Sequence, residues 1–168
     1  MDTILRPDLM KEHPLRKGEH NDCAVVAHAH ITGCSYEEAH RDLLRAGRRP
    51  RRGTYGTASR TALAASFHVA CVKDVAVRVD YNNAFFSKSY TVAEMLRLLP
   101  KEGRYWMAAG HHAFAYINGK VYDNRGKACM RARMKFCFQV ELKQFAPAPS
   151  LEQTDINAMW ERLNKIKL

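Results

Sequence analysis

The chain has 168 residues and a formal net charge of +10 at pH 7, and 46% of its residues are hydrophobic. That length suits one domain with a core of ordinary size, and no apolar run approaches the roughly 20 residues that a membrane-spanning helix needs. We therefore expect a soluble chain without a membrane span, whose positive charge favours anionic partners such as an acidic protein or nucleic acid.

The five cysteines are scattered along the chain without a CxxC pair, and their odd number argues against a disulfide framework. The first 20 residues are charged and do not resemble a signal peptide. These features predict a cytoplasmic protein. No phosphate-binding glycine loop, dinucleotide fingerprint or recognisable metal-ligand spacing occurs, so we expect no cofactor and no metal.

The first part of the chain is predicted to be mainly helical. Residues 1–20 carry prolines and a glycine but no periodic pattern, and we expect an arm laid over the domain. Apolar periodicity, capping boxes and stop signals predict the helices that follow. We expect helices at residues 22–32, 35–46, 57–67 and 91–99.

The later part is predicted to be rich in strands, because β-branched and aromatic residues recur there with alternating polarity. We expect strands at residues 69–72, 105–109, 112–117, 120–122 and 135–142. Asn118-Gly119 is the strongest short signal for a two-residue hairpin turn. The sequence thus predicts an α+β domain over residues 1–146, with N-terminal helices packed on an antiparallel sheet. Residues 147–168 are expected to form a proline-containing connector and a C-terminal amphipathic helix.

Cys23 is expected at the first turn of the first helix, where unpaired backbone N–H groups and the positive end of the helix dipole favour a thiolate. It is therefore a candidate nucleophile. A thiol at neutral pH also needs a neighbouring base.

The hairpin at residues 112–122 offers that base. With the turn at Asn118-Gly119, Ile117 faces Lys120 and Asp123 comes close to Phe114, so an acid or amide after the second strand approaches His112 diagonally. Asp123 is preferred as the orienting group because its charge would stabilise an imidazolium. Asn124 is the alternative.

The order of these features resembles the papain-like cysteine peptidases. It is similar in particular to their compact bacterial and phage versions, such as the bacteriocin-processing peptidase domains. The resemblance implies Cys23 as nucleophile, His112 as general base and Asp123 as orienter, acting on peptide or isopeptide bonds in the cytoplasm of a bacterium or of a phage's host. His112 is preferred because His-Ala-Phe-Ala resembles the opening of papain's histidine strand, and His111 is the alternative base.

The sequence departs from that family at one position. Papain-like peptidases usually carry a glutamine six residues before the nucleophile, which donates to the oxyanion, and this chain has Lys17 there. The Cys23 N–H remains as a donor, and Lys17, His20, Asn21 or Asn124 could support it. One missing donor costs on the order of a hundredfold in rate.

The segment 48–56 contains four arginines, Arg48, Arg49, Arg51 and Arg52, among glycines and a proline. It is expected to be an exposed cationic loop. Guanidinium groups match carboxylates and phosphates, so an alternative function is an inactive papain-like module that binds an acidic protein or nucleic acid through this loop.

Overall fold

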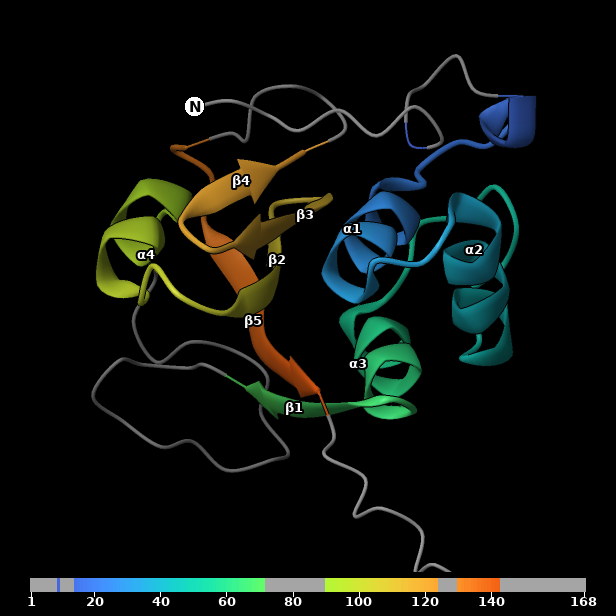
Figure 1. Ribbon diagram of the computed structural model, residues 1–168. Coiled ribbons are helices and arrows are strands. Elements are labelled where there is room, and N and C mark those ends of the chain that lie inside the picture. Colours follow the sequence, from blue (N-terminus) through green and yellow to red (C-terminus); the bar gives the residue numbers. More distant parts are fainter. Residues whose placement is uncertain (1–8, 10–13, 72–89, 124–129, 143–168) are drawn as a thin grey trace, which may run out of the picture.

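The computed structural model describes residue 9 and residues 14–71, 90–123 and 130–142 (Figure 1). The helices are α1 (Cys23–Thr32), α2 (Tyr36–Arg45), α3 (Gly56–Ala64) and α4 (Val92–Leu98), preceded by a 3-10 turn, η2 (Pro14–Arg16). The strands are β1 (Phe67–Cys71), β2 (Arg104–Ala109), β3 (His112–Ile117), β4 (Lys120–Tyr122) and β5 (Met134–Leu142). The predicted C-terminal connector and helix lie outside the described residues, as does Asn124.

The strands form one sheet in the order β1-β5-β2-β3-β4, and every neighbouring pair is antiparallel. Figure 1 shows α1, α2 and α3 on one side of the sheet and α4 on the other. Alternate residues of β2 follow this division, since Trp106 packs toward α1 and α3 whereas Met107 packs toward α4. The α+β class and the antiparallel sheet are therefore confirmed. No helix in the described ranges combines the length and hydropathy of a bilayer-spanning segment.

Helix α1 is the central element of the fold. Seven of its ten residues are buried, because the helix lies between the sheet and α2 and is apolar on nearly every side (Figure 1). Gly33 ends it in the left-handed conformation, with φ of 79°. Burial of this helix fixes the position of its first residue, Cys23, relative to the sheet.

The local signals in the sequence are mostly confirmed. Capping boxes open α2 at Ser35 and α4 at Thr91, each closed by a glutamate three residues later. The hairpin between β3 and β4 turns at Asn118-Gly119, where both residues have positive φ, 47° and 80°. Ile117 pairs with Lys120 in that hairpin, as the register predicts.

The prediction for the third helix was wrong at its C-terminal end. The helix stops at Ala64 rather than Phe67, and Phe67 instead begins β1, paired with Leu142. Its buried side chain joins Leu63 and Phe138 in the core on the α1 side of the sheet. Burial in the sheet therefore outweighs the helical pattern at this position.

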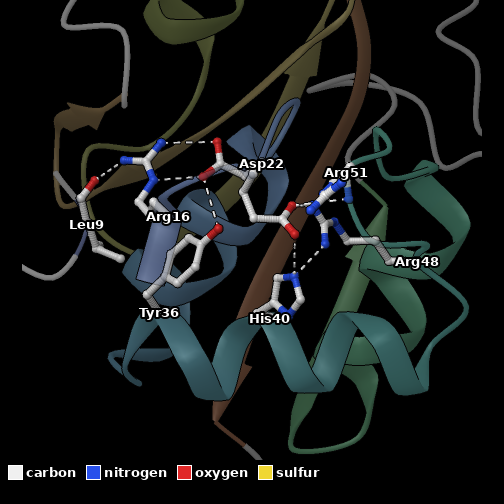
Figure 2. Close-up of polar contacts among 8 residues, drawn as sticks. Leu9, Arg16, Asp22, Tyr36, His40, Arg48 and Arg51 are labelled. Atoms are coloured by element: carbon white, nitrogen blue, oxygen red, sulfur yellow. Dashed lines mark hydrogen bonds and ion pairs between the residues drawn. The ribbon is translucent and has the colours of Figure 1, made fainter. Parts of the chain in front are cut away.

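Near the N-terminus, Arg16 attaches its segment to the core (Figure 2). Its guanidinium donates to both oxygens of Asp22 at 2.7 and 3.0 Å and to the carbonyl of Leu9. The Tyr36 hydroxyl donates to the same carboxylate at 3.0 Å. Burial, and then the Asp22 charge, raise the pKa of Tyr36. This network holds Asp22, the residue immediately before Cys23.

Candidate active site

Cys23 is the first residue of α1 and is half-buried at the N-terminal end of that helix. Its sulfur accepts a hydrogen bond from the Ala113 N–H of β3 at 3.4 Å. Burial raises the pKa of the thiol, but the interaction with His112 and the N–H groups of Ala113 and Ala24 outweigh burial, so the pKa lies below its ordinary value. The site therefore favours a thiolate.

His112 begins β3, and its Nε2 lies 2.6 Å from Oδ1 of Asp123, directly after β4. Since Ala115 pairs with Tyr122, Asp123 falls beside Phe114 and reaches the imidazole diagonally, as the predicted hairpin register requires. Burial lowers the pKa of His112, but the hydrogen bonds and charges of Asp123 and Cys23 outweigh it and raise the pKa to about 9.

The two nitrogens of His112 have different surroundings. Nε2 is engaged by Asp123, whereas Nδ1 is buried and has no hydrogen-bond partner of ordinary geometry among the described residues. His112 lowers the pKa of Cys23, and Cys23 in turn raises the pKa of His112. Nδ1 is thus the nitrogen available to exchange a proton with sulfur or with a reacting group.

The remaining predicted site residues divide into two groups. His111 and Asn21 are exposed and line the same cleft as Cys23. Asn21 adopts φ of 58°, a left-handed conformation that asparagine tolerates. Lys17 is exposed but does not line the cleft among the described residues. The structure therefore brings Asn21, but not Lys17, to the cleft that contains the thiol.

The cleft has a volume of about 1210 Å³. It lies between the start of α1, the loop from α2 to α3, the β2–β3 turn and the first residues of β5. Trp106, Ala108 and Phe136 form its apolar wall on the sheet. A Cβ at Gly56 would lie 2.9 Å from the Phe136 ring, so this glycine allows the loop to approach the sheet closely.

The prediction of a fully exposed arginine loop was wrong for Arg48. Its side chain is buried, with Nη2 2.8 Å from Oε2 of Glu19 and Nη1 2.8 Å from Nε2 of His40 (Figure 2). Glu19 also accepts the Arg51 N–H at 3.3 Å. Arg48 therefore fixes the loop to the helical side of the domain. Arg49, Arg51 and Arg52 are exposed as predicted.

The sequence pattern did not identify two features of the site. Lys135 and Phe136 line the cleft from β5, whereas the alternating pattern predicted only that both residues belong to a strand. Arg16 supports the residue before the nucleophile by a buried ion pair, which a single sequence does not show because the partners are brought together by the turn at η2.

Among the described residues, no three histidine, cysteine, aspartate or glutamate side chains gather as a metal site would require. Comparisons of the chain with protein-family models, with curated proteins and with solved structures found no match.

Proposed function

We propose that this chain is a papain-like thiol hydrolase or acyl-transfer enzyme acting on peptide or isopeptide bonds. The observation that supports the proposal is a helix-terminal Cys23 beside His112, with His112 bonded to Asp123 at 2.6 Å. Nucleophile, base and orienter come from three separate segments, and the first two of them, Cys23 and His112, line one cleft. As in the compact relatives that it resembles, we propose a bacterial or phage origin and action in the cytoplasm.

The chemistry follows from these contacts. The Cys23 thiolate attacks the carbonyl carbon of the scissile bond, and the carbonyl oxygen takes up the negative charge. As the C–N bond breaks, protonated His112 gives its proton to the leaving amine, and a thioester remains on Cys23. A water molecule, or an acceptor amine in acyl transfer, then attacks the thioester while His112 takes its proton. The C–S bond breaks, the acid or the new amide leaves, and the Cys23 thiolate and protonated His112 are restored. Asp123 stabilises the imidazolium in both steps.

Two donors near the sulfur suit the oxyanion. The Cys23 N–H lies at the first position of α1, where backbone N–H groups have no partner within the helix. The Asn21 side chain lies in the same cleft, two residues before the nucleophile. We propose that this amide takes the part that the glutamine of papain-like peptidases plays, at a different position in the chain.

An acetyl-transfer assay tests the proposal without knowledge of the substrate. With p-nitrophenyl acetate, we expect a burst of one equivalent of nitrophenolate and acetylation of Cys23, identified by peptide mass spectrometry. Steady release should follow as His112 activates water against the thioester. Cys34 and Cys137, which do not line the cleft among the described residues, are internal controls. Acetylation spread evenly over the three thiols, or a burst without turnover, would contradict the proposal and favour an inactive binding module.

A further inference from the structure

Apart from the Cys23 thiolate, the charged side chains in the described part of the cleft wall all belong to basic residues. The described part of its wall contains Arg48, Arg49, Arg52 and Lys135, together with His111 and His112, and no aspartate or glutamate. The net charge of +10 is spread over the whole chain, but this concentration beside a candidate nucleophile is local. A cleft lined by one sign of charge concentrates ligands of the opposite sign.

The loop that carries these arginines is anchored by hydrogen bonds to Glu19. Glu19 bonds the Arg48 side chain and the Arg51 N–H, and its Oε1 lies 3.3 Å from Nε2 of His40. The pKa of Glu19 is lowered, because the charge and hydrogen bonds of Arg48 outweigh burial. Glu19 is therefore ionised at neutral pH and holds the loop against α2.

Arg49 and Arg52 are left with their charges uncompensated. Both are exposed and line the cleft, and neither guanidinium makes an ion pair or hydrogen bond with another described residue. Guanidinium groups bind carboxylates in a two-pronged geometry. Lys135, on β5, adds a third cation to the same cleft.

From this arrangement we infer that the substrate is an acidic peptide segment, bound with its carboxylates on Arg49, Arg52 and Lys135 and its scissile bond at Cys23. The inference rests on the proposed function and adds to it the class of substrate. The arginine loop then binds substrate for the enzyme, whereas in the alternative function considered above it binds a partner of an inactive protein.

Three peptidyl vinyl sulfones of one length, Ac-Glu-Glu-Gly, Ac-Gln-Gln-Gly and Ac-Lys-Lys-Gly, test the inference by their rates of addition to Cys23. We expect the glutamate probe to label Cys23 roughly tenfold faster than its glutamine isostere, since hydrogen bonds between charged groups are stronger than those to a neutral amide. The lysine probe should be the slowest.

In the double variant Arg49→Gln/Arg52→Gln, the glutamate probe should label Cys23 only about twofold faster than the glutamine probe. The matched control is Arg41→Gln/Arg45→Gln, which removes the same charge from exposed positions on α2 outside the cleft and should keep the full preference. Iodoacetamide, which carries no charge, should label Cys23 equally in all three proteins.

Several results would overturn the inference. Equal labelling by the three probes, with iodoacetamide labelling still fast and dependent on His112, would reject an acidic substrate and leave the proposed function intact. Slow, His112-independent iodoacetamide labelling would reject the proposed function itself. Tight, Arg49- and Arg52-dependent binding of a fluorescent 20-nucleotide single strand, measured by anisotropy, with no preference among the peptides, would assign the cleft to nucleic acid instead.

Discussion

Replacing Arg16 with methionine is expected to lower the free energy of unfolding by about 3–5 kcal/mol, because the change leaves a buried carboxylate without its counter-charge. Only 4% of the Arg16 side chain and 8% of the Asp22 side chain are exposed. In the variant, Asp22 keeps the Tyr36 hydroxyl as a donor but no cation. Urea unfolding at pH 7, followed by circular dichroism, measures the loss.

Two further variants make this prediction specific. Arg16→Met/Asp22→Asn should recover a large part of the loss, since an amide is cheaper to bury than an unpaired charge. Arg41→Met, which breaks an exposed pair with Glu37 at 3.4 Å, should change stability by less than about 1 kcal/mol. Equal losses of unfolding free energy in Arg16→Met and Arg41→Met would contradict the prediction, since the buried ion pair would then contribute no more to stability than the exposed one.

The change Asp123→Asn is expected to lower acetyl-ester turnover by about 10²- to 10⁴-fold, because His112, the acid–base group, loses the charge that stabilises its imidazolium. The amide can still hydrogen-bond His112 but carries no charge. Because burial lowers the pKa of His112 and Asp123 opposes it, that pKa should fall from about 9 in the variant. An NMR titration of the imidazole measures the change directly.

The same substitution has a consequence for folding. The pKa of His112 rises on folding from 6.5 to about 9, so the stability due to its protonated form is fully present below pH 6.5 and is lost as the pH rises through about 9. The stability difference between wild type and Asp123→Asn should narrow over that interval.

Asp42→Asn is the control for the Asp123 variant, because Asp42 lies 3.7 Å from a second histidine, His28, outside the cleft. It should leave both the turnover and the pKa of His112 unchanged. A loss of turnover equal to that of Asp123→Asn would assign the effect to general destabilisation.

Local signals in the sequence were sufficient for much of the fold. The cap at Ser35, the glycine stop at Gly33 and the Asn118-Gly119 turn each depend on residues close together in the chain, and all three are present. The turn also fixed the register, and through it the approach of Asp123 to His112. The approach of Asp123 to His112 was therefore expected from the sequence, with Asn124 left open as the alternative partner.

Long-range contacts were not predictable in the same way. The burial of Arg48 depends on Glu19, which lies 29 residues away in the chain, and nothing near Arg48 distinguishes it from the exposed Arg49. The start of β1 at Phe67 depends similarly on its pairing with Leu142. The resemblance to papain-like enzymes indicated Cys23 and His112, but only the folded chain brings the arginine loop to their cleft.

The most direct test of the account is the pH dependence of iodoacetamide alkylation at Cys23, in the wild type and in His112→Ala, read by peptide mass spectrometry. With the pKa of Cys23 lowered by His112, labelling in the wild type should stay fast below pH 7. In His112→Ala it should require a pH near or above the ordinary thiol pKa of about 8.5, since burial then dominates. Wild-type labelling that rises only near that pH, whatever residue stands at position 112, would contradict the thiolate–imidazolium pair and with it the proposed enzyme.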